Sequence, residues 1–238
     1  MINKIIKLFA IIHSSFFIRK FIITGVAASV EHHHLATLLH PNTIIDVGAN
    51  RGQFALLCRS LFPNAKIIAF EPLTKPAAIF QKLFINDANI QLMPCALGKQ
   101  HAQMVMHISH QDDSSSLLPI TQQAQVFPGT EEKDIQTVTV YRLDEILTKK
   151  DIISPALLKI DVQGYELEVL EGGQSLLQLF DMIYVECSFF ELYEGQALAN
   201  QVIAFLQNQG FQLSGFYNPY YDKKGRCVQA DLLFENIS

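Results

Sequence analysis

Several features that mark large classes of protein are missing from this 238-residue chain. Its four cysteines lie far apart and form no Cys-x-x-Cys pair, so we expect reduced, mostly buried thiols and a cytoplasmic location. The formal net charge of −5 leaves no basic excess, and nucleic acid is therefore not an expected partner. Internal repeats and low-complexity tracts are absent as well. A hydrophobic share of 49% is ample for a buried core and excludes a disordered chain.

A membrane-spanning segment is not predicted either. The apolar run at residues 8–18 is interrupted by His13 and falls well short of the roughly 20 residues that cross a bilayer. No signal peptide with a small-residue cleavage site is recognisable. Residues 1–20 nevertheless place apolar side chains at helical spacing between basic residues, which predicts an N-terminal helix. We expect this helix to pack on the domain or on a partner chain in a homo-oligomer. The alternative is peripheral contact with the inner face of an anionic membrane.

From residue 43 onward, short apolar runs alternate with amphipathic stretches, as in parallel strands connected by helices. We predict one Rossmann-like α/β domain over residues 41–238, preceded by a helical extension over residues 1–40. Its seven-stranded sheet should be mostly parallel, with helices on both faces. The last strand should be antiparallel, because residues 218–226 are too few for a crossover helix. Strands are predicted at 43–47, 66–71, 90–95, 157–161, 182–187, 211–217 and 227–234, and helices at 52–61, 75–85, 164–170, 175–179 and 196–208.

The alternation of strands and helices is interrupted between residues 102 and 140. Two alternating strands, 103–109 and 135–140, bracket a polar loop rich in serine and aspartate. A long loop without secondary structure in a compact domain is usually functional or disordered. We expect this loop to project near the carboxyl ends of the strands, where open α/β sheets bind their ligands.

Residues 43–54 carry the strongest functional signal. A buried strand ends in Asp46, Gly48 follows in the turn and Gly52 opens a helix. Glycine at these positions would let the backbone approach a ligand closely, and Asp46 would pair with a ligand ammonium group. The Gly-x-x-x-Gly spacing differs from the Gly-x-Gly-x-x-Gly of dinucleotide sites, which favours a cationic amino-acid ligand over pyrophosphate. Glu71 ends the next strand, where a carboxylate would take both ribose hydroxyls of an adenosine.

Three runs of residues resemble a known family. They are Asp46-Val-Gly-Ala-Asn-Arg-Gly-Gln-Phe54, Phe70-Glu-Pro72, and Leu157-Leu-Lys-Ile-Asp-Val-Gln-Gly-Tyr-Glu166 followed by Val169-Leu-Glu-Gly172. With residues 138–147 and Tyr184-Val-Glu186, roughly residues 40–235 look like the FkbM family of methyltransferases. The resemblance implies S-adenosylmethionine as methyl donor and O-methylation of a hydroxyl, often on a sugar or a polyketide-type metabolite.

The same resemblance implies a set of donor-binding residues. One departure is that the family commonly has an acid where this chain has Gln163, so this position supplies no charge. The expected donor-binding residues are Asp46, Gly48, Asn50 and Gly52 at the methionine end, Glu71 at the ribose, and Cys95 and Ala96 beside the adenine, with Phe54 and Pro72 also in the donor site.

Methyl transfer to a hydroxyl calls for a general base near the strand tips, because the acceptor oxygen also loses a proton. Asp161, which ends the fourth strand, is the first candidate; alternatively, it hydrogen-bonds the turn that follows. Glu186 at the fifth strand tip is the next, together with His107 or His110 at the entry to the serine-rich loop. Asp161, Glu186 and a loop acid would also be able to gather a divalent cation, but their spacing is not diagnostic and no metal site is predicted.

Two further features have a structural and a functional interpretation. The tract His32-His-His34 looks like a metal site, but no further ligands flank it and an exposed helix end is expected. An aromatic cluster follows the fifth strand and continues into the final hairpin. We expect it to pack in the core and hairpin, with the wall of an acceptor pocket as the alternative. Its members are Phe189, Phe190, Tyr193, Phe216, Tyr217, Tyr220 and Tyr221.

The favoured function is therefore methyl transfer from S-adenosylmethionine to a small-molecule or glycan acceptor. Two alternatives stay open. One is an NAD-dependent oxidoreductase, which the glycine spacing and the closing hairpin disfavour. The other is a non-catalytic, membrane-associated binding protein that uses the N-terminal helix as its anchor.

Overall fold

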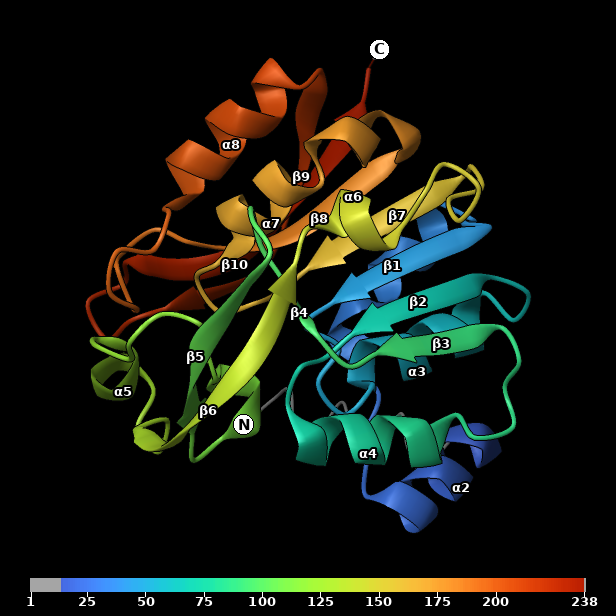
Figure 1. Cartoon of the computed structure of the whole chain (residues 1–238), viewed down its shortest axis with the longest axis horizontal. Coiled ribbons are helices and arrows are strands. Elements are labelled where there is room, and N and C mark those ends of the chain that lie inside the picture. The colour runs from blue at the N-terminus through green and yellow to red at the C-terminus, as the bar shows by residue number, and fades with distance from the viewer. Residues whose placement is uncertain (1–13, 238) are drawn as a thin grey trace.

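A seven-stranded sheet runs through the middle of the protein in the order β3-β2-β1-β7-β8-β10-β9 (Figure 1). The computed structural model describes residues 14–237. The strands from β3 to β8 pair in parallel, whereas β10 is antiparallel to both β8 and β9. This is the predicted mostly parallel sheet with an antiparallel last strand. Its strands are β1 (Thr43–Val47), β2 (Lys66–Phe70), β3 (Ile90–Met93), β7 (Ala156–Ile160), β8 (Met182–Ser188), β9 (Phe211–Tyr221) and β10 (Cys227–Asn236).

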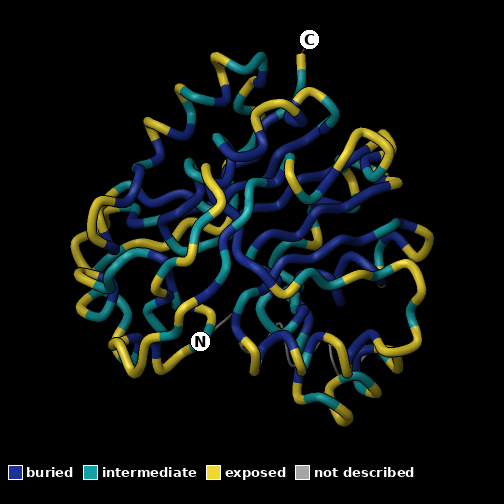
Figure 2. The backbone as a smooth tube through the Cα atoms, in the orientation of Figure 1, coloured by how far each residue is buried: buried dark blue, intermediate teal, exposed yellow. Residues whose placement is uncertain are grey.

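Helices cover both faces of this sheet, as predicted (Figure 1). The core on one face includes Leu56 of α3 and Phe80 of α4, and the core on the other includes Val169 of α7 and Leu206 of α8. The central strands are buried because their side chains meet a helix on either face (Figure 2). The helices around the sheet are α2 (Ser15–Thr24), α3 (Gln53–Leu61), α4 (Thr74–Leu83), α6 (Leu143–Ile146), α7 (Glu166–Gly172) and α8 (Ala199–Asn208), with the 3-10 helices η1 (Val30–Thr37) and η3 (Gln174–Leu179).

A second, three-stranded sheet stands where the βα alternation is interrupted. Its strand order is β4 (Ala96–Leu97), β6 (Glu132–Tyr141) and β5 (Ala102–Ser109). Between β5 and β6 the chain forms the 3-10 helix η2 (Asp112–Ser114) and the helix α5 (Gln123–Val126). The expectation of a loop without secondary structure was therefore wrong. Elements this short contain too few residues to show a hydrophobic period, so the sequence did not reveal them.

The closing hairpin is longer than predicted. β9 continues to Tyr221, so Asn218 and Pro219 lie within the strand and the turn comprises residues 222–226. β9 tolerates proline because it is an edge strand, where part of the backbone needs no partner strand. The backbone of Asn218 is left-handed, with φ 47°, in a stretch where the pairing of β9 with β10 shifts register. The hairpin is therefore bent beside the end of the sheet.

The N-terminal extension packs against the domain as far as it is described. Residues 1–13, which hold much of the predicted N-terminal helix, lie outside the described residues. The side chain of Ser14 caps α2, which ends at Gly25 with φ 71°. Phe17 of α2 and Leu35 of η1 join the same core as α3. Within residues 14–237, we find no helix long and apolar enough to cross a membrane.

His32 and His34 do not form an exposed helix end, contrary to the prediction. The ring of His34 stacks on Tyr217 with centroids 3.8 Å apart. The ring of His32 lies edge-on to Phe54 and Tyr184, each at 5.6 Å. Both histidines therefore pack from the extension against side chains of the domain. Such a contact between distant segments is not visible in the local sequence.

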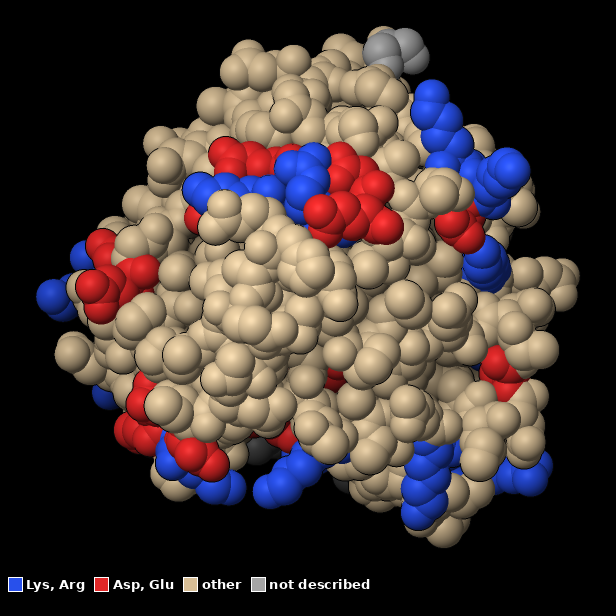
Figure 3. All heavy atoms as spheres, in the orientation of Figure 1, with Lys and Arg blue, Asp and Glu red and all other residues tan. Residues whose placement is uncertain are grey.

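The state of the cysteines and the distribution of surface charge are in line with the amino-acid composition. All four cysteines are free, and Cys58, Cys95 and Cys187 are buried, which agrees with the prediction. In the view of Figure 3, charged side chains of both signs lie in small mixed groups separated by uncharged surface. Such mixing is ordinary for a surface that does not bind a polyanion.

Candidate functional site

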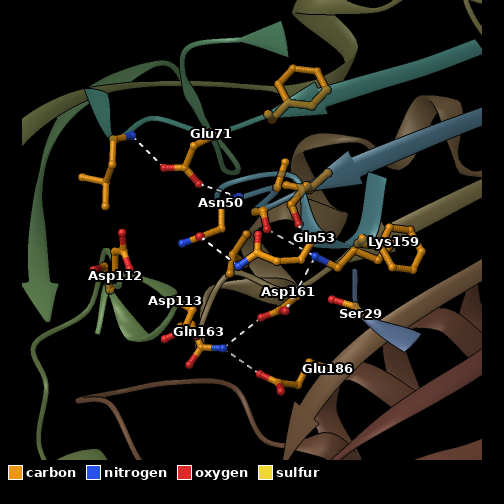
Figure 4. Close-up of a pocket in the computed structure, with 18 of the residues that line it drawn as sticks. Ser29, Asn50, Gln53, Glu71, Asp112, Asp113, Lys159, Asp161, Gln163 and Glu186 are labelled. Atoms are coloured by element: carbon orange, nitrogen blue, oxygen red, sulfur yellow. Dashed lines mark hydrogen bonds and ion pairs between the residues drawn. The ribbon is translucent and has the colours of Figure 1, made fainter. Parts of the chain in front are cut away.

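A cavity of about 560 Å³ lies at the carboxyl ends of β1, β2, β7 and β8 (Figure 4). Its volume is within the range of sites that hold small molecules and cofactors. The turns after β1 and β7 line it, together with the ends of β2 and β8, the chain after β5, part of the closing hairpin and η1. The expectation that the segment after β5 reaches this edge of the sheet is therefore confirmed, since Asp112, Asp113 and Ser115 line the cavity.

Two glycines shape the turn after β1, and protein atoms, rather than a ligand, explain why they must be glycine. Gly48 has φ 77°, and a Cβ there would lie 1.8 Å from the backbone oxygen of Asp161. Gly52 has φ 91°, and a Cβ there would lie 2.9 Å from the rings of Phe80 and Phe84. Gly48 lines the cavity, whereas Gly52 does not. The prediction for Gly52 as a ligand contact is thus corrected: it allows α3 to pack closely on α4.

Asp46 is also placed differently from the prediction. Its carboxylate is fully buried within β1 and lies 3.2 Å from Nζ of Lys159, its neighbour on β7. It does not line the cavity, so a protein ammonium takes the place of the expected ligand ammonium. Burial raises the pKa of Asp46, and Lys159 opposes that shift. Burial also works against the charge of Lys159, but Asp46 and Asp161 outweigh it and raise the pKa of the lysine.

Lys159 itself was not singled out from the sequence. It lines the cavity and its Nζ lies 3.6 Å from the carboxylate of Asp161 as well. The sequence nevertheless indicated a buried ion pair here, because Lys159 is a lone lysine in an otherwise apolar strand and a buried lysine nearly always requires an acidic partner.

Glu71 reaches the cavity as predicted and organises the two turns beside it. Its Oε2 accepts a hydrogen bond from the backbone N–H of Asn50 at 2.9 Å, and its Oε1 from that of Leu73 at 2.7 Å. Burial raises the pKa of Glu71 to about 7, although these two hydrogen bonds oppose the shift. A carboxylate has about four lone-pair directions, so both oxygens can still accept a bond from a ligand hydroxyl.

The other five expected donor residues all line the cavity. Asn50 lines the cavity next to Glu71, and its left-handed backbone, with φ 46°, closes the turn. Asn50 Oδ1 accepts a hydrogen bond from the amide of Gln53 at 3.2 Å, and both side chains face the cavity (Figure 4). Four further predicted residues also line it: Phe54, Pro72, Cys95 and Ala96.

The two candidate carboxylates lie together and share one amide. Nε2 of Gln163 donates to Oδ1 of Asp161 and to Oε2 of Glu186, each at 2.8 Å (Figure 4). The hydroxyl of Tyr193 donates to Oε1 of Gln163 at 2.8 Å, which fixes the orientation of the amide. Burial, and then the charge of Asp161, raise the pKa of Glu186 well above its ordinary value. The neutral Gln163 thus stands where the family pattern suggested an acid, and it joins two carboxylates.

The predicted histidines lie outside this arrangement. His107 on β5 pairs with Glu132 on β6, and His110 is exposed where the chain leaves β5. Neither lines the cavity, so the prediction of His110 or His107 as a base is corrected. Alternation along β5 explains this, because Met106 occupies the inward position beside His107. The described residues contain no group of three or more His, Cys, Asp or Glu side chains that would hold a metal ion.

An ion pair connects the turn after β1 with the segment after β5. The guanidinium of Arg51 donates to both oxygens of Asp112, with distances of 2.7 and 2.9 Å from Nη2.

Of the aromatic cluster, whose members are all described, Tyr220 alone lines the cavity. The other members follow the structural interpretation; for example, Phe189 packs against Phe216 at 6.1 Å.

Comparison with known proteins gives a consistent result. The family model described as "Methyltransferase FkbM domain" matches residues 46–213. The 2-O-methyltransferase NoeI of Sinorhizobium fredii is 27% identical over 86% of this chain and 84% of its own length. The 31-O-demethyl-FK506 methyltransferase FkbM of Streptomyces tacrolimicus is 23% identical over 79% of each chain. The hexuronic acid methyltransferase AglP of Haloferax volcanii is 31% identical over 59% of this chain and 54% of its own length.

Solved structures agree on the fold. An rRNA-methylase candidate from Clostridium thermocellum superposes with a TM-score of 0.51 at 12% identity, covering 87% of this chain and 93% of that one. A protein of the NADB-Rossmann superfamily from Streptococcus agalactiae gives 0.50 at 10% identity, covering 87% and 68%. The predicted Rossmann-like fold is confirmed.

Proposed function

The chain belongs to the FkbM family of methyltransferases, and on that premise we propose that it methylates a hydroxyl group of a sugar or a related metabolite. Family membership implies S-adenosylmethionine as the donor and decides against the oxidoreductase and non-catalytic alternatives. The names of NoeI, a 2-O-methyltransferase, and AglP, a hexuronic acid methyltransferase, support a sugar-like acceptor. We take residues 41–238 as the methyltransferase domain and residues 1–40 as its extension.

One observation carries the proposal: a single cavity brings the donor motif of β1 and β2 next to a pair of carboxylates on β7 and β8. In the proposed arrangement, Glu71 accepts hydrogen bonds from the ribose hydroxyls. Gly48 and Asn50 border the methionine end, and Cys95 and Ala96 border the adenine. The buried carboxylate of Glu71 beside an open cavity suits this role, because a ligand hydroxyl would complete its hydrogen bonding.

The carboxylate pair would act on the acceptor. The donor supplies a methyl group on a positively charged sulfur, and the acceptor oxygen displaces that sulfur in line, so that positioning provides much of the catalysis. Asp161 would accept the hydroxyl proton, since its side chain is 37% exposed and reaches the cavity. Burial raises the pKa of Glu186 well above its ordinary value, so this side chain would hold a proton and bind the acceptor rather than act as the base.

Gln163→Glu is expected to shift the pH dependence of methyl transfer towards higher pH. A third carboxylate beside Asp161 and Glu186 would disfavour further negative charge in this cluster, because like charges at hydrogen-bond distance repel each other. The rising limb of kcat/KM should move up by roughly one pH unit. The measurement is a pH profile of S-adenosylhomocysteine formation for both proteins. An unmoved limb would show that the amide does not tune the base.

The proposed acceptor class is tested by incubating the protein with S-adenosylmethionine and a panel of glycosides. We expect S-adenosylhomocysteine to form together with an O-methyl product located by mass spectrometry. Methylation of an amine but of no hydroxyl across matched amino and hydroxy sugars would contradict an oxygen acceptor.

A further inference from the structure

One wall of the cavity is built from residues that none of the donor motifs contains. His32 comes from η1, Asn218 from β9 and Asp231 from β10, and all three line the cavity. Asn218 and Asp231 lie on the side of β8 away from β1, because β10 and β9 follow β8 in the sheet, and His32 meets them from η1. The two strand residues of this wall therefore lie across β8 from the donor motif, whereas His32 lies beside Phe54 of that motif.

Asp231 is the centre of a hydrogen-bonded network. Its Oδ2 accepts bonds from Nδ2 of Asn218 at 2.7 Å and from the hydroxyl of Tyr184 at 3.0 Å. Nδ1 of His32 lies 3.0 Å from that hydroxyl and 3.6 Å from Oδ2. Within residues 14–237, both donors that reach Asp231 use Oδ2, so Oδ1 is left for a group in the cavity. Burying such a network is costly unless its polar atoms are satisfied.

The backbone is strained where this wall is formed. Asn218 has φ 47° inside a strand, and the pairing of β9 with β10 shifts register on the approach to Asp231. A non-glycine residue in this conformation is uncommon and persists where the surrounding structure enforces it. The strain brings the Asn218 amide onto Asp231 at the edge of the cavity.

The wall continues directly into the carboxylate pair. Asp231 is the pairing partner of Glu186 across β10 and β8. Oε1 of Glu186 accepts from the amide of Gln229 at 2.7 Å, and its Oε2 accepts from Gln163. Tyr220 adds an aromatic ring that lines the cavity, held against Phe127 at 4.5 Å. Planar carboxylates and amides beside an aromatic face provide the hydrogen-bond acceptors and donors that a pyranose ring with neighbouring hydroxyls requires.

Among the described residues, this wall carries no lysine or arginine to receive an anionic acceptor. Among the described residues that line the cavity, Lys159 is the one lysine or arginine, and Asp46 and Asp161 both lie within 3.6 Å of its Nζ. A carboxylate on the acceptor would lie against Asp231, which is ionised above its pKa of about 6. Like charges so close together in a partly buried site are strongly unfavourable.

We propose that His32, Asn218 and Asp231, together with Glu186, form the acceptor subsite, and that it takes an uncharged pyranose and discriminates against a uronic acid. This inference rests on the proposed function and names the acceptor class of the same cavity. Oδ1 of Asp231 accepts hydrogen bonds from ring hydroxyls, and Tyr220 supports the apolar face of the ring.

The test uses saturation-transfer NMR on full-length protein loaded with S-adenosylhomocysteine. The probes are methyl glucopyranoside and methyl glucopyranosiduronic acid, which differ only in the oxidation of one carbon. Burial raises the pKa of Asp231 to about 6, so the titration is run at about pH 8, where this carboxyl is ionised. We expect the neutral glycoside to bind at least about tenfold more tightly than the uronic acid.

Two variants locate the binding. Asp231→Asn removes one carboxylate oxygen, and Asn218→Gly removes the amide while glycine accepts the left-handed backbone. Each should weaken binding of the neutral glycoside at least about fivefold and leave S-adenosylhomocysteine binding intact. Asp222→Asn, in the exposed turn of the same hairpin and outside the cavity, is the matched control and should change neither.

Three outcomes would overturn the subsite. These are equal or tighter binding of the uronic acid, absence of binding by both glycosides, and glycoside binding that neither variant weakens. Failure of the proposed function would be distinct, because the wild-type protein would then not bind S-adenosylhomocysteine at all.

Discussion

Asp161→Asn is expected to lower the rate of methyl transfer by about 100- to 10,000-fold, the range of a lost general base. The asparagine would preserve the shape of the side chain and a bond to Gln163, but it has no oxygen that takes up a proton near neutral pH. Donor binding should change little, because Asp161 lies on the acceptor side of the cavity. The measurement is single-turnover formation of S-adenosylhomocysteine with a methylated glycoside.

The comparison for this prediction is Glu186→Gln, which should raise KM for the acceptor more than it lowers kcat. A rate for Asp161→Asn within about tenfold of wild type would show that this carboxylate is not the base. That result would favour the alternative role of Asp161, in which its side chain only stabilises the turn after β7 through its hydrogen bond with Gln163.

Lys159→Met should lower the free energy of unfolding by about 3–5 kcal/mol, because it leaves a buried carboxylate without its partner. Asp46 is fully buried and its Oδ1 lies 3.2 Å from the lysine Nζ. The same Nζ donates to the backbone oxygen of Gly48 at 3.3 Å, so the turn would lose a support as well. The measurement is urea-induced unfolding near neutral pH.

Two comparisons separate this effect from ordinary surface electrostatics. Lys66→Met breaks an exposed pair with Asp151 and should cost about 1 kcal/mol or less. Asp46→Asn added to Lys159→Met should recover much of the loss, because an amide is cheaper to bury than a charge. The deficit should also shrink as the pH falls, since a carboxyl whose pKa is raised by folding stabilises the folded state when protonated. A deficit below about 1 kcal/mol for Lys159→Met would mean that Asp46 is neutral in the native protein.

The strands of the main sheet were predictable because burial on both faces produces continuous apolar runs. β1 was predicted with its observed bounds, and Glu71 could be placed at the cavity because it directly follows β2. Periodicity worked here because each strand is flanked by helices that remove it from water. The same reasoning failed for η2 and α5, whose three or four residues are held by tertiary contacts.

Pairings between distant segments were beyond the sequence. Asp46 looked like a ligand contact because its partner, Lys159, lies on a strand more than a hundred positions later. His32 and Asp231 meet only because β10 inserts between β8 and β9, which depends on sheet order rather than on local pattern. The residues on the donor side of the site were therefore recognisable from the sequence motifs. Those on the acceptor side were identified only from their positions in the structure.

The central claim is that Glu71 anchors the donor in this cavity, and calorimetric titration of S-adenosylhomocysteine tests it most directly. We expect micromolar binding that Glu71→Ala weakens at least tenfold, equivalent to about 1.4 kcal/mol. Glu131→Ala, an exposed change outside the cavity, should have no effect. Affinity should also fall as the pH drops through about 7, because ribose hydroxyls donate to the ionised form of Glu71. Absence of binding to folded wild-type protein, or tighter binding of NAD(H), would contradict the account.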